Sequence, residues 1–479
     1  MTLLSPSSYR TLSSQFFREA TPSPLAKADL LLFNEPLACD LQLPAATDLY
    51  AGHVSKYHLK SLALAYAGHQ FGHFVPLLGD GRAHLLGEVT TPDGRSFDIQ
   101  LKGSGTTPYS RGGDGRAPLS AVLREYLISE AMHGLNIPTT RALAVISSQD
   151  KIYRQQGMVT AGILTRVAQG SLRVGSFEFA ASLAEVKSLK QLTDYAIKRH
   201  YPEILTSPRP YLEFYQHVLK RQAQLIALWM SVGFIHGVMN TDNMSISGET
   251  LDYGPCAFMD EFDLKTVFSY IDQQGRYAFG NQANIAYWNL AILAQSLAPI
   301  IEDYDGLQEQ LNLFPEVFRQ AWHQCLHAKL GIPKHSFESL ALIEPLFVLM
   351  QQEQCDYTNT FRLLGKAVIC TEAQQQLEKQ LGDSEQARAW VRDWLKHVHL
   401  QQLPLTEIQK QMNQVNPVYI PRNHLVEQVL YEAVEENNLS LLHTLLPLWQ
   451  NPFTEQPHTE QWQQPASPQE RVPYTFCGT

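Results

Sequence analysis

The sequence predicts an α+β fold built from two lobes, a strand-containing lobe followed by a mainly helical one. Residues 83–89 and 96–101 have the composition of strands and are joined by a turn. After about residue 155, apolar residues recur mainly at helical spacing. An apolar content of 44% with 10% aromatic residues is typical of a globular protein with a large core, and 479 residues suffice for two lobes with additions.

The first part of the chain supplies the predicted strands and one long helix. Residues 1–50 are rich in Ser and Pro, so we expect short helices and turns there, packed on the body as an N-terminal extension. The turn between the two strands reads Thr91-Pro92-Asp93-Gly94, which favours a tight reversal. Pro118 then begins a helix with apolar residues at helical spacing, and this helix is expected to end near Gly134.

The second part is expected to be helical. A broad apolar face marks residues 211–232, and residues 284–400 continue in helical pattern. Prolines interrupt the chain near residue 420, before a helical pair at 424–449 and an extended tail. We therefore divide the chain into four parts: an N-terminal extension (1–50), a small lobe (51–155), a large lobe (156–405) and a helical C-terminal region with its tail (406–479).

The segment after residue 232 carries the most informative motif. In a protein kinase the catalytic loop reads His-Arg-Asp, four residues and Asn, and an Asp-Phe-Gly follows. Here His236 and Asn243 keep that spacing, and Asp252-Tyr253-Gly254 stands at the place of Asp-Phe-Gly. Val238 occupies the position of the catalytic Asp. The pattern predicts a protein-kinase-like fold that retains the metal ligands but lacks the usual base.

Three residues of this segment are candidates for chemistry. Asn243 and Asp252 offer oxygen ligands for Mg²⁺ or Mn²⁺. Asp242 is the carboxylate of the loop itself and could accept a proton from an attacking hydroxyl. Such a relocated base is chemically tolerable, because positioning and electrostatics dominate phosphoryl-type transfer. The alternative is that both motifs are ordinary polar turns.

Upstream residues could hold phosphates. Gly79 and Gly81 let the backbone approach a phosphate closely, and Arg82 adds a bidentate donor, although an ordinary hairpin turn has the same composition. Lys102 lies in a predicted strand, like the phosphate-binding lysine of kinases. Glu125 on the following helix could pair with Lys102. Taken singly, Lys102 could be a solvated edge charge and Glu125 a surface acid.

Three further groups carry weaker signals. Residues 110–116 form a charge-dense, glycine-rich loop that could wrap phosphates through backbone N–H groups or serve as a mobile linker. Arg166 and Arg173 are spaced to reach one anion, or they could form surface ion pairs. His69 and His73 have the i,i+4 spacing of metal ligands, but no third ligand is evident, so metal binding is not favoured.

Composition excludes several classes of partner. A net charge of −10 argues against general binding to nucleic acid or to an anionic membrane. No apolar run reaches the length of a membrane span, and the first twenty residues lack the hydrophobic segment of a secretory signal. The six cysteines are scattered without metal-ligand spacing, which favours a reducing compartment. We expect a cytoplasmic protein.

Taken together, these motifs resemble the SelO (YdiU-type) family, the pseudokinase protein adenylyltransferases named after selenoprotein O. The similarity runs from about residue 50 to the C-terminus. The segments that carry it are YAGHQFG (66–72), LGDGRA (78–83), LLGEV (85–89), DIQLKGSGTTPYSRGGDGRAPL (98–119), LREYLISEAMHGLNIPTTRALAV (123–145) and HGVMNTDNMSISGETLDYGPCAFMDEFD (236–263).

The resemblance implies a kinase-like fold that binds ATP in flipped orientation and transfers AMP to Ser, Thr or Tyr hydroxyls of proteins, releasing pyrophosphate. Some members also use UTP with Mn²⁺. By position it implies that Glu125 pairs with Lys102, that Asn243 and Asp252 hold the metal, and that Asp242 accepts the proton. The residues implied to hold the nucleotide are Gly79, Gly81, Arg82, Lys102, Asp114, Gly115, Arg166 and Arg173.

The sequence also departs from the family. Gly170-Ser171 stands where members often show Ser-His, and Phe268 replaces the cysteine that pairs with a C-terminal one in some members, so a free tail thiol at Cys477 is expected. Two rival functions stay open, a conventional kinase and a non-catalytic nucleotide-binding scaffold. Val238 at the position of the catalytic base argues against a conventional kinase. Retention of both Asn243 and Asp252 argues against a non-catalytic scaffold.

Overall fold

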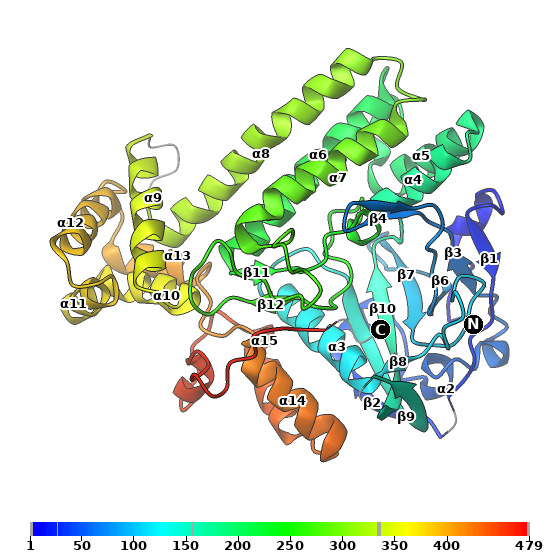
Figure 1. The fold of residues 1–479 in the computed structure, drawn as a ribbon, viewed down its shortest axis with the longest axis horizontal. Helices are drawn as coiled ribbons and strands as arrows, with labels where there is room; N and C mark the ends of the chain where they lie inside the picture. The colour runs from blue at the N-terminus through cyan, green and yellow to red at the C-terminus, as the bar shows by residue number, and fades with distance from the viewer. Residues whose placement is uncertain (1–2, 26, 156, 333–336, 477–479) are drawn as a thin grey trace.

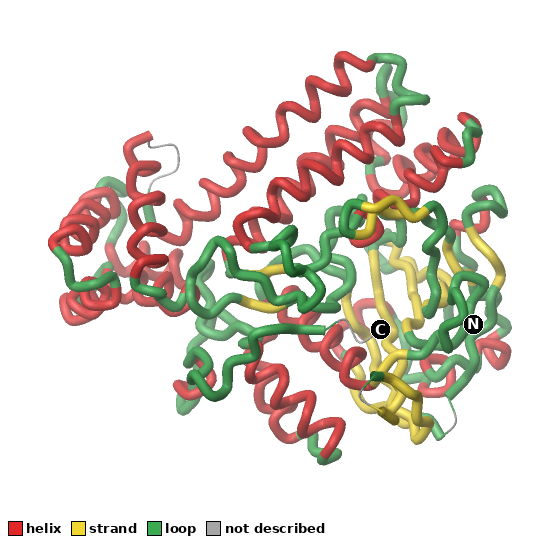
Figure 2. Tube along the Cα trace, viewed as in Figure 1, coloured by secondary structure: helices red, strands yellow, loops and turns green. Residues whose placement is uncertain are grey.

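A computed structural model describes residues 3–25, 27–155, 157–332 and 337–476. The molecule combines one large sheet with many helices, as the sequence predicts (Figures 1 and 2). Figure 1 shows the strands of the large sheet gathered at one end of the molecule and helices α9 (Phe337–Gln352), α11 (Thr371–Gln380) and α12 (Glu385–His399) at the other. No helix in the described residues is long and apolar enough to cross a membrane.

The sheet is antiparallel in all its described strand pairs and has the order β1-β3-β6-β7-β10-β9-β2, with β8 added on β10. The predicted strands are β6 and β7, and the predicted turn joins them through a bond from Thr91 N–H to the Arg95 carbonyl at 2.8 Å. The strands are β1 (Phe17–Glu19), β2 (Asp29–Phe33), β3 (Leu62–Leu64), β6 (Ala83–Thr90), β7 (Ser96–Lys102), β8 (Ala117–Pro118), β9 (Arg141–Arg154) and β10 (Gly157–Ala168).

Two parts of the sheet differ from expectation. Residues 1–50 contain not only short helices and turns but also the strands β1 and β2, which pair with β3 and β9. The long hairpin β9–β10 was not predicted, and it spans the expected lobe boundary near residue 155. Its central residues are buried without alternation, so the period-two signal of a half-exposed strand is missing.

The sheet is buried because both of its faces are covered. Helix α3 (Leu119–Gly134), the predicted helix, packs on β9 and β10 on one face and belongs to the main core. Helices α1 (Glu35–Leu41) and α2 (Thr47–Tyr50) belong to a second core on the other face. The neighbouring residues Leu85 and Leu86 of β6 enter different cores, as alternation along a strand requires.

Helices and the loops between them dominate the rest of the described structure. Two small sheets lie outside the large one, β4 (Gly68–Gln70) with β5 (His73–Val75) and β11 (Phe234–Ile235) with β12 (Ala257–Phe258). The predicted helix at 211–232 is α6 (Pro210–Ser231), which packs against α7 (Gln282–Leu297) and α8 (Tyr304–Leu330). The predicted C-terminal pair is α14 and α15. This pair spans α14 (Asn423–Glu435) and α15 (Ser440–Gln450), and the other α-helices are α4 (Val174–Ser182), α5 (Val186–His200), α9 (Phe337–Gln352), α10 (Tyr357–Ala367), α11 (Thr371–Gln380), α12 (Glu385–His399) and α13 (Leu405–Asn413).

The C-terminal tail packs against the segment that follows Asp252-Tyr253-Gly254. Thr475 bridges to Ser269 in parallel fashion, and its N–H donates to the Phe268 carbonyl at 2.7 Å. Phe268 therefore lies beside the tail, although Cys477 itself lies outside the described residues. The cysteines that the structure describes, at 39, 256, 325, 355 and 370, form no disulfide.

Candidate active site

Most of the predicted site residues line one cavity. Its volume of about 470 Å³ lies within the usual range of ligand pockets. The predicted residues at its wall are Gly79, Gly81, Arg82, Lys102, Asp114, Gly115, Arg166, Arg173 and Asp252. Residues that are more than a hundred positions apart in the sequence thus meet around one space large enough for a small molecule.

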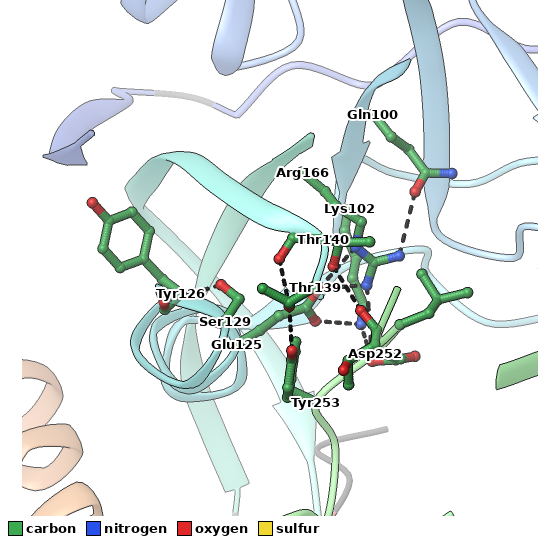
Figure 3. A network of polar contacts seen from close by, with 12 residues as sticks. Gln100, Lys102, Glu125, Tyr126, Ser129, Thr139, Thr140, Arg166, Asp252 and Tyr253 are labelled. Carbon is green, nitrogen blue, oxygen red and sulfur yellow. Dashed lines mark hydrogen bonds and ion pairs between the residues drawn. The ribbon is translucent and has the colours of Figure 1, made fainter. Parts of the chain in front are cut away.

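The side chain of Lys102, at the end of strand β7, points into this cavity. Ile99 and Leu101 enter the core behind the sheet, so the alternate residues Gln100 and Lys102 face the other way. The Lys102 ammonium donates to Glu125 Oε2 and to Asp252 Oδ1, both at 2.5 Å (Figure 3). Lys102 is therefore not a solvated edge charge, and Glu125, 4% exposed, is not a surface acid.

Arg166 on β10 completes the cluster. Its Nε donates to Glu125 Oε1 at 2.9 Å, and its Nη2 lies 3.9 Å from Asp252 Oδ1. Burial alone would raise the pKa of Asp252, but Lys102 and Arg166 bring that pKa well below its usual range. Asp252 therefore stays ionised, with negative oxygen available at the cavity wall.

The glycine loop is also held by Asp80, which is not among the predicted site residues. Asp80, between Gly79 and Gly81, is buried and accepts the Leu64 N–H at 3.1 Å and the Tyr66 hydroxyl at 3.2 Å. Burial raises its pKa. The only sequence signal for this role was its place inside the motif LGDGRA. Gly79 has φ 65°, and any side chain there would overlap the ring of Tyr109.

Asp114 lies at the cavity wall with its carboxylate already engaged. Arg154, at the end of β9, donates to its two oxygens at 2.8 and 2.9 Å. This bidentate pair fixes the loop at residues 110–116 to the sheet. No local pattern marks Arg154, because its partner is distant in sequence.

Arg173 connects the cavity to the catalytic loop. Its guanidinium lies over the ring of Tyr66 at 4.2 Å, and Nη1 donates to the backbone oxygen of Asp242 at 3.2 Å. Arg173 is 6% exposed and lines the cavity, so it is not a surface ion-pairing residue. The same side chain thus faces the ligand space and holds the loop that carries the predicted base.

Asp242 and Asn243 lie in a short 3₁₀ helix, Thr241–Asn243, outside the wall of the 470 Å³ cavity. Asn243 donates its Nδ2 to the Val238 carbonyl at 3.1 Å, which leaves its amide oxygen for other partners. Asp242 Oδ1 is buried and has no hydrogen-bond partner in the described structure. Burial raises the pKa of Asp242 to about 6, although Arg173 opposes the shift.

The side chains at this site could supply some, but not all, of the ligands of a hard divalent cation. In the described residues, no cluster of three or more His, Cys, Asp or Glu side chains could hold a metal. Asn243 and Asp252 offer two oxygens, which suits Mg²⁺ when phosphates and water supply its other ligands. His69 pairs with Glu178 at 2.5 Å, and His73 is exposed, so the two histidines do not act as a pair.

Comparison with known proteins identifies the family. The family model described as protein adenylyltransferase SelO matches residues 1–450. The chain is 46% identical to the protein nucleotidyltransferase YdiU of Rhizobium meliloti (strain 1021), over 98% of each chain. It is 47% identical to the protein of the same name from Alkaliphilus metalliredigens, over 99% of this chain and 97% of that one. The chain therefore belongs to the SelO family of protein adenylyltransferases and is an enzyme of the nucleotidyltransferase class.

Proposed function

We propose that this enzyme transfers AMP from ATP to Ser, Thr or Tyr hydroxyls of proteins and releases pyrophosphate. The observation that carries the proposal is the cavity in which Lys102, Arg166 and Arg82 gather beside an ionised Asp252. Clustered cations of this kind suit a triphosphate, because guanidinium and ammonium groups donate to its oxygens. UTP is a second candidate donor of the same chemistry.

The proposed fold is that of a protein kinase, with two lobes. The small lobe would be residues 51–155 and the large lobe residues 156–405, with the N-terminal extension before them and residues 406–479 after them. The order of glycine loop, Lys102, Glu125 and the His236 segment along the chain supports this division. The five cysteines that the structure describes form no disulfide, which favours action in a reducing cytosol.

Each residue at the cavity then has a role toward the nucleotide. The loops containing Gly79, Gly81 and Gly115 approach the phosphates with their backbone, and Glu125 holds Lys102 in place. Arg82, Asp114, Arg166 and Arg173 complete the nucleotide site. Asn243 and Asp252 would hold Mg²⁺ or Mn²⁺, which when bound neutralises charge on the phosphate oxygens.

The reaction is a substitution at the α-phosphorus. The acceptor hydroxyl oxygen forms a bond to that phosphorus, while the bond to the bridging oxygen of the pyrophosphate breaks. The hydroxyl proton passes to the carboxylate of Asp242. With Val238 at the usual place of the base, Asp242 is the carboxylate of the loop that can take the proton.

Labelled ATP tests the proposal against both rivals. The full-length protein is incubated with Mg²⁺ or Mn²⁺ and ATP labelled on either the α- or the γ-phosphate, and its intact mass is measured. We expect α-label on protein and a mass gain of one AMP. Retention of γ-label alone would identify a conventional kinase. Biological effects that survive Asp252→Ala without any label transfer would identify a scaffold.

A further inference from the structure

A small hairpin outside the large sheet lies against the loop that carries Asp242. Its strands are β4 (Gly68–Gln70) and β5 (His73–Val75). The His69 N–H donates to the hydroxyl of Thr241 at 2.7 Å, and the Phe71 N–H donates to Asn240 Oδ1 at 3.0 Å. The backbone of the hairpin is thus bonded to the side chains of the two residues before Asp242.

Glu178 on α4 holds the same loop from another side. Its Oε2 accepts the Thr241 hydroxyl at 2.7 Å, and its Oε1 lies 2.5 Å from Nδ1 of His69. The Thr241 hydroxyl accepts one bond and donates another, so its orientation is fixed. Thr241 is fully buried and Glu178 is 5% exposed, so these bonds are shielded from competing water.

Asp242 has little free space between these elements. A Cβ atom on Gly68 would lie 2.7 Å from Asp242 Oδ1. A Cβ atom on Gly175 would overlap the carbonyl oxygen of Ala67 and lie 3.4 Å from the Cα of Asp242. The hairpin and the start of α4 therefore approach the backbone and side chain of Asp242 as closely as glycine allows.

We infer that Thr241, Glu178 and His69 are positioning residues that fix the place of Asp242 for proton acceptance. The inference rests on the proposed function, in which Asp242 is the proton acceptor. Among the described residues, no hydrogen bond or ion pair joins these three side chains to Lys102 or Arg166. Arg173 touches the same loop only through the backbone oxygen of Asp242. Loss of these side chains should therefore lower turnover much more than it weakens nucleotide binding.

The sharpest test is a pair of substitutions at Thr241. Thr241→Val keeps the shape and removes the hydroxyl, whereas Thr241→Ser keeps the hydroxyl. We expect Thr241→Val to lower kcat for AMP transfer by about 10- to 100-fold, because a small misplacement of a reacting group has effects of that size. The KM for ATP and the Kd, measured by calorimetry, should change by much less than kcat, because Lys102 and Arg166 have no bond to this network. Thr241→Ser should restore kcat.

A second pair addresses His69. An Asn side chain can place an amide N–H near the position of Nδ1, so His69→Asn should retain more turnover than His69→Ala. His73→Ala serves as the matched control, since His73 is an exposed residue of the same hairpin. It should behave as the wild type in kcat, KM and amide exchange.

Hydrogen–deuterium exchange separates this inference from the proposed function. Amides of residues 236–243 should exchange faster in Thr241→Val than in Thr241→Ser or the wild type. Equal exchange and equal kcat in the two Thr241 variants would overturn the inference. A wild type that transfers only γ-label would overturn the proposed function, and the exchange rates would still decide whether the network holds the loop.

Discussion

Asp252 and Asp242 are the same residue type in one short segment, yet their surroundings shift their pKa values in opposite directions. Asp252 lies between Lys102 and Arg166, whose charges bring its pKa below the usual range despite burial. Asp242 is enclosed by protein, and burial raises its pKa to about 6. Paired carboxylates whose pKa values are driven apart are typical of sites where one stays charged and one exchanges protons.

The difference lies in what touches each carboxylate. Oδ1 of Asp252 meets a cation directly, whereas Oδ1 of Asp242 has no hydrogen-bond partner in the described structure. Arg173 reaches Asp242 through its backbone oxygen. A group that binds a metal must remain ionised, and a group that accepts a proton must be able to change its charge. The two environments meet these two requirements.

The largest effect is expected at the charged member of the pair. Asp252→Asn removes the negative oxygen that faces Lys102 and the proposed metal. We expect AMP transfer to fall by about 10³-fold, the size typical of losing one preorganised electrostatic contact. The measurement is incorporation of α-labelled AMP into protein at saturating ATP.

The matched control is Asp393→Asn on α12. Asp393 is exposed and pairs with Lys396 on the same helix, outside the site. Its loss should leave transfer unchanged. A fall of similar size in both variants would mean that the Asp252 result reflects general damage and not its place in the cavity.

The next effect is a dependence of rate on pH. Asp242 accepts a proton only when it is ionised, so kcat/KM should fall about tenfold for each pH unit below about 6 and level off above it. Asp252 stays ionised over this range and adds no slope. Initial rates between pH 5 and 8 test this, at a constant metal concentration. The residual activity of Asp242→Asn should lack the slope, and a slope that persists there would exclude Asp242 as its source.

The comparison also shows what the sequence could predict. Strand β7, helix α3 and helix α6 were predicted because their patterns are local. The order of loop, lysine, glutamate and catalytic segment indicated which residues would gather, and the cavity wall contains most of them. Local pattern and motif spacing were sufficient for these features.

What the sequence could not predict depends on distant contacts. The central residues of the hairpin β9–β10 are buried on both faces, so they show no alternating pattern. The pair of Arg154 with Asp114 joins residues forty positions apart. The opposite environments of Asp242 and Asp252 likewise depend on which strands and loops enclose them, and neither burial nor a neighbouring cation is visible in the residue type.

The smallest expected effect is on stability, and its sign should differ between the two carboxylates. Asp242 has a folded pKa of about 6, above its unfolded value, so the folded state binds its proton more tightly. The resulting stability is present below the unfolded pKa and is lost as pH rises through 6. At pH 8 the ionised, buried carboxylate therefore costs stability.

Asparagine carries no such charge, so Asp242→Asn should be more stable than the wild type at pH 8, by about 2–3 kcal/mol from a shift of about two pKa units. The gain should vanish below pH 4. Asp252→Asn should be less stable than the wild type at pH 8. The folded pKa of Asp252 is lowered, and its negative charge stabilises the folded state through Lys102 and Arg166. Urea unfolding of both variants, without nucleotide or metal, measures the two signs. If both variants lose stability equally, burial does not govern Asp242, and the contrast between the two carboxylates fails.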